Sequence, residues 1–373
     1  MKYTGPRIDL DVHHTWRSPG ELFPYLPERW RRVAEQGQIS LKPAIYHHPA
    51  ARGVYARMDA IPDSGGPAGS SLEMMQAQLL DRYNIQHAVV SFNVGFEAGV
   101  TNVLLATELS RAANRWSIER WLSGQDERLY GAVLIPTQDI DAAAAELRVV
   151  GAHDRMVEAL LILNGVGKPY GHPLYHPIFA AACDLDVPVG IHTGGETTIH
   201  GAATHVAAGG PPLTRFQRHV VMGQPIQHYL LSMIVYGVFD KYPGLRVILK
   251  EPGVGWLPSL MWEMDSNRDL LESEGVFLKR WPSDYVREHV WISSQPLEEP
   301  HRPRDLTDLL STFDWIEDRI CFSSDYPHHD ADDADYISRR IPRAWWDKFF
   351  YNNAAAAYGW LGTSASARVP AAT

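Results

Sequence analysis

Apolar residues along the chain gather in eight short runs, and longer stretches with helical periodicity separate these runs. The first run is RIDLDVH at residues 7–13, and the others lie at 87–92, 129–136, 157–163, 187–192, 246–251, 289–294 and 319–325. Short, nearly continuous apolar runs are typical of buried parallel strands. A last helical stretch, RAWWDKFFYNNAAAAYGWL, follows the eighth run. The pattern therefore predicts eight strands, helices between them and a closing helix.

The alternation of strands and helices favours an α/β fold with a parallel sheet, and eight such units predict a (β/α)8 TIM barrel. An open, doubly wound sheet would need a glycine-rich phosphate turn after its first strand, and DVHHTW at that place is not such a turn. The connections after strands one and five are long. Because active sites of these barrels lie at the rim formed by the C-terminal strand ends, we expect irregular rim loops at 44–71 and 193–216.

One domain of this class can hold a chain of this length, so residues 1–361 are predicted to form a single barrel. The remaining stretch, GTSASARVPAAT at 362–373, lacks large apolar residues and is predicted to be a disordered tail.

The composition excludes several classes of function. The net charge of −10 gives no basic surface for nucleic acid. No apolar run approaches the ~18 residues that a membrane span needs, and the N-terminus lacks the apolar core of a signal peptide. Cys183 and Cys321 stand in apolar stretches and are expected to be free thiols in a reducing compartment. We therefore expect a cytoplasmic protein that acts on a small molecule.

Candidate chemistry lies where the predicted strands end. Asp11 and His13 end strand one, His192 ends strand five, Glu251 ends strand six and Asp325 ends strand eight. Taken alone, a strand-ending histidine is more often structural, and an aspartate often caps the next helix. Four strand ends with the same chemistry would meet at one rim and predict a metal site. Mixed histidine and carboxylate ligands suit Zn²⁺, Mn²⁺ or Fe²⁺, and the carboxylate-rich set favours manganese or iron.

At these residues the chain resembles the amidohydrolase superfamily, in the branch of aminocarboxymuconate-semialdehyde decarboxylase, from about residue 7 to residue 360. The motifs that carry the resemblance are IDLDVH, PVGIHTGG, GVFDKYPGLRVILKEPGVGWLPSLMWEMD and FSSDYPHHD. The resemblance implies a metal-dependent enzyme in which His13, His192 and Asp325 bind the metal. It also implies that Asp325 carries a proton.

Two residues depart from the family pattern, and both are carboxylates. Asp11 stands where the family usually has a first metal-binding histidine, and Glu251 stands where the decarboxylase branch has a catalytic histidine. A carboxylate can bridge two ions, so we expect a second metal held by Glu251 with nearby histidines. The candidate histidines are His14, His228, His328 and His329. The alternatives are that His328 only hydrogen-bonds a ligand and that His228 caps its helix or faces the rim as a catalytic group.

This carboxylate-rich set resembles the dinuclear non-haem oxygenases built on the same barrel, the platensimycin-pathway hydroxylase and the 2-aminoisobutyrate hydroxylase. The resemblance implies two iron ions, or manganese and iron, that use O₂ and an external electron donor to hydroxylate an unactivated C–H bond. Trp16, Phe92 and Tyr326 would then wall the substrate pocket.

Two other interpretations remain open. In the first, one Zn²⁺ or Mn²⁺ serves a hydrolase or a non-oxidative decarboxylase, Asp325 moves the proton, and Glu251 is a general base or a positioning group. In the second, the chain is a non-catalytic paralogue that binds a partner subunit, which would predict degraded ligands, whereas every strand-end ligand is present. The superfamily is commonly oligomeric, so a homo- or hetero-oligomer is expected.

Overall fold

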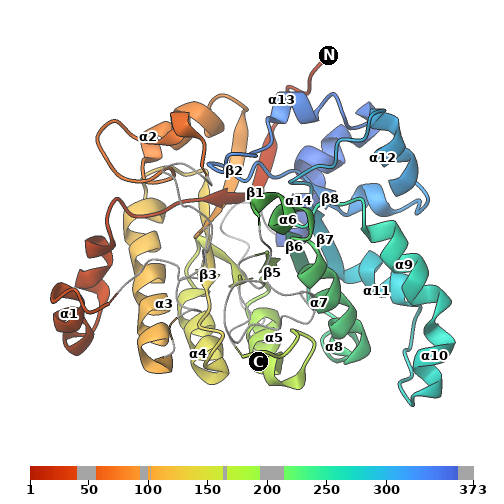
Figure 1. Ribbon diagram of the computed structural model, residues 1–373, viewed down its shortest axis with the longest axis horizontal. Coiled ribbons are helices and arrows are strands. Elements are labelled where there is room, and N and C mark those ends of the chain that lie inside the picture. Colours follow the sequence, from red (N-terminus) through yellow and green to blue (C-terminus); the bar gives the residue numbers. More distant parts are fainter. Residues whose placement is uncertain (40–55, 93–99, 101, 163–165, 194–213, 360–373) are drawn as a thin grey trace.

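Eight parallel strands form a ring in the computed structural model, and helices surround the ring (Figure 1). The structure describes residues 1–39, 56–92, 100, 102–162, 166–193 and 214–359. Neighbouring strands in the ring are also neighbours in the sequence, from β1 through to β8. The strands are β1 Arg7–His13, β2 Ile85–Ser91, β3 Leu129–Leu134, β4 Met156–Leu161, β5 Val189–His192, β6 Val247–Lys250, β7 Val290–Ser293 and β8 Ile320–Cys321.

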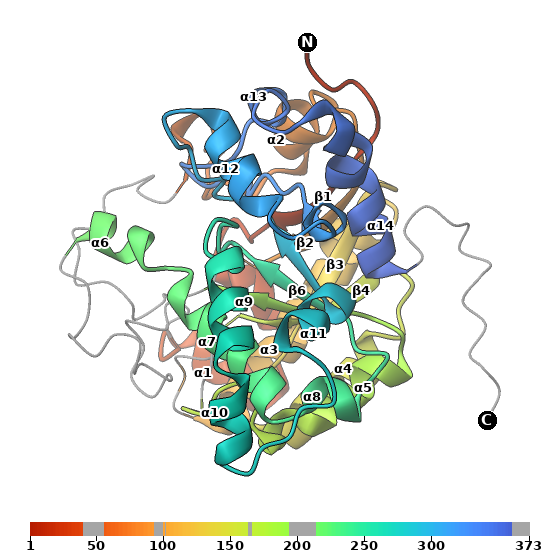
Figure 2. The same cartoon turned by 90° about the vertical axis from the view of Figure 1, so that its right-hand side faces the viewer.

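The helices lie outside the strands in both views (Figure 1, Figure 2). The α-helices are α1 Glu28–Glu35, α2 Leu72–Met75, α3 Val103–Ser117, α4 Ile140–Val150, α5 His176–Asp184, α6 Arg215–Val220, α7 Gln224–Val235, α8 Val238–Lys241, α9 Leu257–Ser266, α10 Arg268–Ser273, α11 Pro282–His289, α12 Pro303–Leu310, α13 Ala334–Ile337 and α14 Asn353–Tyr358. Shorter 3₁₀ turns are η1 Pro19–Tyr25, η2 Met58–Ala60, η5 Pro173–Tyr175, η7 Ile316–Asp318 and η8 Arg343–Trp345. Wider π turns are η3 Gln76–Leu80, η4 Ile118–Leu122 and η9 Lys348–Asn352.

Side-chain caps fix where several helices begin. Asn102 accepts a hydrogen bond from the backbone N–H of Leu105 at the start of α3, and Asp139 accepts one from the backbone N–H of Ala142 at the start of α4. Such caps satisfy backbone N–H groups that have no partner inside the helix. α14 ends at Gly359, whose φ of 70° lies in the left-handed region that favours glycine.

Strand β1 shows how the barrel separates its apolar and polar faces. All seven of its residues are buried. Because successive side chains of a strand point to opposite faces, Ile8, Leu10 and Val12 share one face, and the intervening polar residues share the other. The polar face carries Asp9, Asp11 and His13, which contact His192 at the end of β5 and the segment that follows β8.

The segment after β8 closes the ring against β1. β8 itself has only two residues, but Tyr326 forms a parallel bridge with Val12. The backbone N–H of Asp325 donates to the carbonyl of Asp11 at 3.0 Å, and the N–H of His13 donates to the carbonyl of Tyr326 at 2.7 Å. The seam of the barrel is therefore built by the same residues that carry the candidate site.

The predicted fold is confirmed, and each of the eight predicted strands is present. Six strands end one to four residues earlier than predicted. β6 stops at Lys250 because Glu251, with a φ of 59°, leaves the extended conformation, and Asp325, which follows β8, has a φ of 58°. The long connections after β1 and β5 are also present.

Several predicted segments fall largely or wholly outside the described residues. The rim loop at 44–71 is described from residue 56 onward, and the loop at 193–216 is described at Thr193 and from residue 214 onward. The predicted tail at 362–373 lies outside them, so the domain bounds stay a prediction. Among the described helices, none combines the length and the apolar character that a membrane crossing requires.

Candidate metal centre

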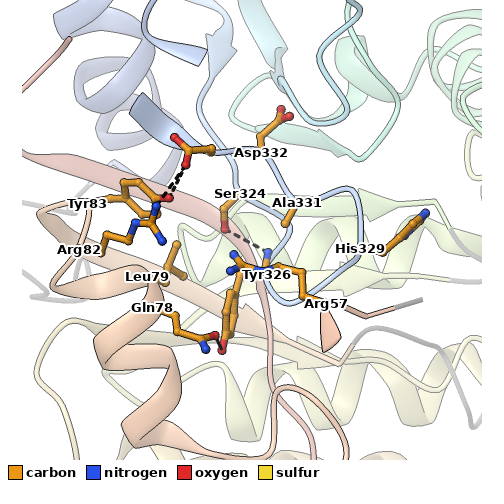
Figure 3. Close-up of a pocket in the computed structure, with 11 residues that line it drawn as sticks. Arg57, Gln78, Leu79, Arg82, Tyr83, Ser324, Tyr326, His329, Ala331 and Asp332 are labelled. Carbon is orange, nitrogen blue, oxygen red and sulfur yellow. Dashed lines mark hydrogen bonds and ion pairs between the residues drawn. The ribbon is translucent and has the colours of Figure 1, made fainter. Parts of the chain in front are cut away.

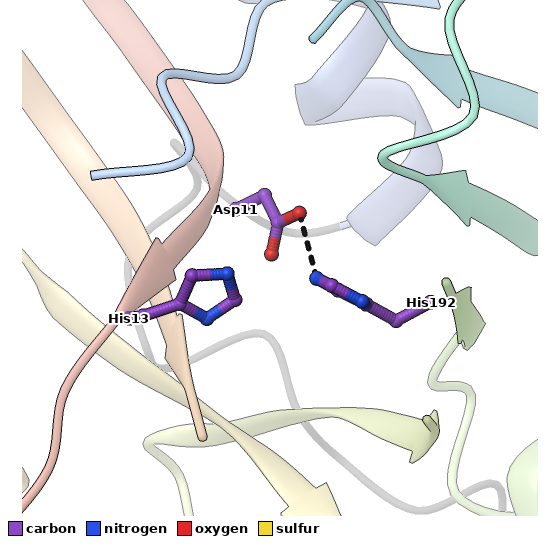
Figure 4. A group of neighbouring side chains, drawn as sticks. All are labelled: Asp11, His13 and His192. Atoms are coloured by element: carbon purple, nitrogen blue, oxygen red, sulfur yellow. Dashed lines mark ion pairs between the residues drawn. The ribbon is translucent and has the colours of Figure 1, made fainter. Parts of the chain in front are cut away.

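Three side chains from two strand ends meet inside the mouth of the barrel. Asp11 and His13 come from β1 and His192 comes from β5, and Figure 4 shows the three facing one another. His192 Nε2 lies 3.2 Å from Asp11 Oδ2. One donor atom from each of the three residues lies within 4.8 Å of the others. This spacing is compatible with a single ion held between them.

A second group of donors shares His13 with the first. His13 Nε2 lies 2.8 Å from Asp325 Oδ1, and His328 Nδ1 lies 2.7 Å from Asp325 Oδ2. Donor atoms of His13, Asp325 and His328 also lie within 4.8 Å of one another. The two groups therefore form one cluster, called here the metal cluster: Asp11, His13, His192, Asp325 and His328.

The buried donor atoms of the metal cluster fit a divalent ion. Both carboxylate oxygens of Asp11, Oδ1 of Asp325 and the Nε2 atoms of His13 and His192 are buried, and among the described residues they form ion-pair contacts but no well-directed hydrogen bond. Leaving a buried polar group without a partner costs about 1–3 kcal/mol, more for a charged group. Oxygen and imidazole nitrogen donors suit Mn²⁺, Fe²⁺ or Zn²⁺, and a bound ion would supply the missing partner.

Charges within the metal cluster are strongly coupled. Burial alone would raise the pKa of Asp11, but His192, Lys250 and His13 outweigh it and lower that pKa below its ordinary value. Burial alone would lower the pKa of His192, but the Asp11 carboxylate raises it to about 10. Burial lowers the pKa of His13 to about 3. In the metal-free protein Asp11 and His192 thus form an ion pair, and a metal would displace the imidazole proton.

Glu251 lies beside the metal cluster and belongs to neither donor group. Its Oε2 accepts a hydrogen bond from Thr193 Oγ1 at 3.1 Å and lies 3.7 Å from His192 Nδ1. Its backbone N–H donates to Ser293 Oγ at 2.9 Å, which holds the left-handed turn at the end of β6. Burial, followed by the nearby charge of Asp325, raises the pKa of Glu251 to about 7. The structure thus brings Glu251 to the site as a neighbour of the donors, where the sequence predicted a bridging ligand.

A buried lysine lies below the metal cluster, and sequence reasoning missed it. Lys250 Nζ lies 2.9 Å from Glu158 Oε1 and 3.8 Å from Asp11 Oδ1, and the side chains of Lys250 and Glu158 are fully buried. Tyr358 OH donates to the other oxygen of Glu158 at 2.6 Å. A Cβ at Gly190 would lie 2.1 Å from Glu158, so glycine makes room for this carboxylate. A charged residue inside each of two apolar strand runs was the available signal.

His14 does not join the metal cluster. Its Nδ1 lies 3.0 Å from the carbonyl oxygen of Ser91, and its Nε2 lies 2.8 Å from Ser117 Oγ. The ring is buried against Phe92 and two tryptophans. The predicted metal-ligand role of His14 therefore has no support in the geometry, because both ring nitrogens face serine oxygens.

The other two candidate histidines also lie outside both donor groups. His329 is 46% exposed, and its Nδ1 lies 2.9 Å from Asp330 Oδ1. His228 is half-buried in α7 and is absent from both donor groups. Of the histidines proposed for a second ion, the structure brings only His328 to the cluster.

The predicted pocket walls lie in two different places. Tyr326 donates to Gln78 Oε1 at 3.0 Å and lines a cavity of about 250 Å³ with Arg57 and Ser324 (Figure 3). No residue of the metal cluster lines that cavity. Trp16 and Phe92 pack together with ring centroids 5.3 Å apart, beside the ring of His14.

Known proteins with similar sequences include decarboxylases. The γ-resorcylate decarboxylase of Rhodococcus jostii is 26% identical over 277 residues, which cover 70% of this chain and 79% of that protein. The γ-resorcylate decarboxylase of a Polaromonas species is 27% identical over 289 residues, with coverages of 74% and 84%.

Solved structures with the same fold include enzymes of the same kind. The 2,6-dihydroxybenzoate decarboxylase from Rhizobium has a TM-score of 0.63 at 21% identity, covering 96% of this chain and 99% of that one. A dihydroxybenzoic acid decarboxylase from Polaromonas with bound manganese has a TM-score of 0.62 at 20% identity, with coverages of 98% and 100%. These likenesses confirm the fold, and none of the relatives described here supports the oxygenase subgroup.

The model of one family matches residues 8–360, which is nearly the whole chain and includes every residue of the metal cluster. This match confirms the superfamily resemblance carried by the strand-end motifs. The chain belongs to the amidohydrolase family.

Proposed function

We propose that this protein is a divalent-metal-dependent, non-oxidative decarboxylase of a small hydroxylated aromatic acid. The observation that carries the proposal is the convergence of Asp11, His13, His192 and Asp325, with their buried donor atoms facing one another, at the C-terminal ends of the strands. The named relatives supply the reaction class, since they are decarboxylases of dihydroxybenzoates. This is the alternative interpretation of the sequence, and it replaces the oxygenase.

Four residues would hold the ion: Asp11 and His13 from β1, His192 from β5 and Asp325 from the seam. A divalent ion held there would act as a Lewis acid on an oxygen atom of the substrate. His328 Nδ1 donates to Asp325 Oδ2 and so orients that carboxylate. Hydrogen bonds from such neighbours fix the direction of metal ligands and tune their basicity.

The reaction also needs a proton on the aromatic carbon. The bond between the ring and the carboxylate breaks, CO₂ leaves, and the ring carbon takes up one proton. Glu251 is the residue best suited to deliver that proton, because a carboxyl with a pKa of about 7 is partly protonated at neutral pH. Thr193 donates to Oε2 of Glu251, so we expect the acidic proton on Oε1.

This role explains the departure at the end of strand six. The decarboxylase branch carries a catalytic histidine there, and a buried carboxyl with a raised pKa can perform the same transfer near neutral pH. Glu251 then needs no second ion to account for it. A single ion is also favoured because Lys250 already places a positive charge 3.8 Å from Asp11.

The test combines metal analysis with two assays on the purified protein. We expect about one Mn²⁺ per chain, release of CO₂ from 2,6-dihydroxybenzoate or 5-carboxyvanillate, and no O₂ consumption. Asp11→Ala serves as the control that removes a ligand and should abolish both metal binding and CO₂ release. About two iron or manganese ions per chain, with O₂ consumed when an electron donor is added, would overturn the proposal in favour of the oxygenase.

A further inference from the structure

His14 is buried directly beside the metal cluster, although it takes no part in it. Only 2% of its surface is exposed, and both ring nitrogens contact serine oxygens. Ser91 ends β2, and Ser117 ends α3 where the helix widens into the π turn η4. The imidazole therefore connects the ends of β1, β2 and α3 at one point.

The hydrogen-bond partners determine which nitrogen of His14 carries the proton. A carbonyl oxygen can only accept, so Nδ1 donates to the carbonyl of Ser91. The neutral ring then accepts at Nε2 from the hydroxyl of Ser117.

Ser91 links His14 to a member of the metal cluster. Its carbonyl also accepts from the backbone N–H of His14 at 3.1 Å, so His14 holds this carbonyl twice. Its hydroxyl lies 3.2 Å from Nδ1 of His13, while Nε2 of His13 faces Asp325 at 2.8 Å. Ser91 thus contacts the side of the His13 ring that points away from the cluster.

Aromatic side chains keep the His14 ring from turning. Phe92, Trp116 and Trp121 lie with ring centroids 4.7, 5.5 and 5.3 Å from that of His14. All three are at most 4% exposed. A close-packed shell of this kind leaves one orientation of the imidazole, the one that satisfies both serines.

We infer that His14 is a positioning residue for His13: acting through Ser91, it fixes the His13 ring with Nδ1 protonated and Nε2 aimed at the metal. The inference rests on the proposed metal centre. It adds a residue that influences the metal affinity although its side chain contacts no metal ligand, substrate or ion. The contacts run from Ser117 to His14, from His14 to the carbonyl of Ser91, and from the hydroxyl of Ser91 to His13.

The experiment measures Co²⁺ binding by the purified protein, with dissociation constants and visible absorption spectra as readouts. His14→Phe keeps the ring packing but removes both hydrogen bonds, so we expect about tenfold weaker binding and a shifted spectrum. In His14→Asn the amide nitrogen can replace Nδ1 as the donor to Ser91, so binding and spectrum should return towards wild type. His289→Phe is the matched control: it removes the same kind of contact, from a buried imidazole to the backbone carbonyl of Leu245, away from the metal cluster, and should leave the spectrum unchanged.

Ser91→Ala tests the connection itself. It should weaken Co²⁺ binding as His14→Phe does, and the double variant should be no weaker than either single one, because both remove the same link. Fully additive losses would overturn the inference.

Failure of the inference is distinguishable from failure of the proposed function. Wild type that binds no Co²⁺ at the cluster, with Asp11→Ala behaving identically, overturns the metal centre. Wild type that binds Co²⁺, with His14→Phe unchanged in affinity and spectrum, overturns only the positioning role. If His14→Phe does not fold, Ser117→Ala is the variant to measure. Loss of the hydrogen bond from Ser117 to Nε2 of His14 should weaken Co²⁺ binding about threefold. Unchanged Co²⁺ binding would contradict the inference.

Discussion

Asp11 places a carboxylate where the family usually has an imidazole, and Lys250 stands behind it as the compensating cation. The ammonium lies between Asp11 and Glu158, and all three side chains are at most 1% exposed. Burying charges is costly unless each is paired, so the three groups depend on one another. Tyr358 completes the set by donating to Glu158.

Replacing Lys250 should therefore destabilise the protein strongly. Lys250→Met leaves two buried carboxylates without their cation, and removal of one member of a buried pair typically costs about 3–5 kcal/mol. Urea unfolding of the metal-free protein measures this loss. Lys250→Met combined with Glu158→Gln removes the unpaired charge and should recover part of the stability. Equal stability of the single and double variants would show that charge pairing is not the cause.

Glu251→Gln separates the proton-donor role from the bridging role predicted from the sequence. Because Glu251 lies outside both donor groups, we expect the variant to bind metal as wild type does. Loss of a general acid should lower kcat by about 10²–10⁴-fold with little change in KM. Metal analysis and steady-state kinetics measure the two effects. Loss of an ion from Glu251→Gln would instead support a bridging ligand.

Residue patterns predicted which strand ends meet but not where each side chain points. Asp11, His13, His192 and Asp325 were predicted together because alternation along a strand and the barrel geometry fix their direction. The direction of His14 depends on how the chain turns after the strand, which no periodicity encodes. The adjacent pair His328 and His329 separated for the same reason, one into the cluster and one to the surface.

At the level of elements, the eight strands were predictable because each is an apolar run flanked by helical sequence. The residues at which the strands end were less predictable. β6 stops at Lys250 because the left-handed backbone at Glu251 is held by a hydrogen bond to Ser293. β8 stops at Cys321, and the backbone after it bonds to Phe349 and Asp9, which lie far away in the sequence. Lys250 and Glu158 were missed because a single charge in an apolar strand shows no partner in the sequence.

The start of β3 is tied to η3 by Asp126, whose contribution to stability should depend on pH. Arg128 hydrogen-bonds this carboxylate, Gln76 adds a further bond, and the pKa of Asp126 falls to about 2. A lowered folded-state pKa stabilises the protein above the unfolded value of about 4 and loses that effect as pH falls towards 2.

Asp126→Asn should therefore be less stable than wild type by about 1 kcal/mol at pH 7, and the difference should shrink below pH 4. Denaturation at a series of pH values gives the curve. A difference that stays constant down to pH 2 would mean that the charge of Asp126 contributes nothing.

For the whole molecule, a metal bound at the cluster would join β1, β5 and the seam segment. An ion that binds only the folded state stabilises it by about 2.7 kcal/mol at a hundredfold excess over its Kd. We expect Mn²⁺ to raise the unfolding temperature, a chelator to reverse the rise, and Asp11→Ala to abolish it. Calorimetry with and without Mn²⁺ checks this. An equal rise in Asp11→Ala would place the stabilising ion elsewhere.

The seam between β8 and β1 also has a consequence for the newly made chain. Asp9 accepts a hydrogen bond from the backbone of Ser324, a contact that spans 315 residues. Asp11 and His13 therefore leave the ribosome long before Asp325 is synthesised. β1 cannot form this contact until the segment after β8 is present. No chain that ends before Asp325 can complete the metal cluster, so the whole cluster forms only when the two ends of the barrel meet.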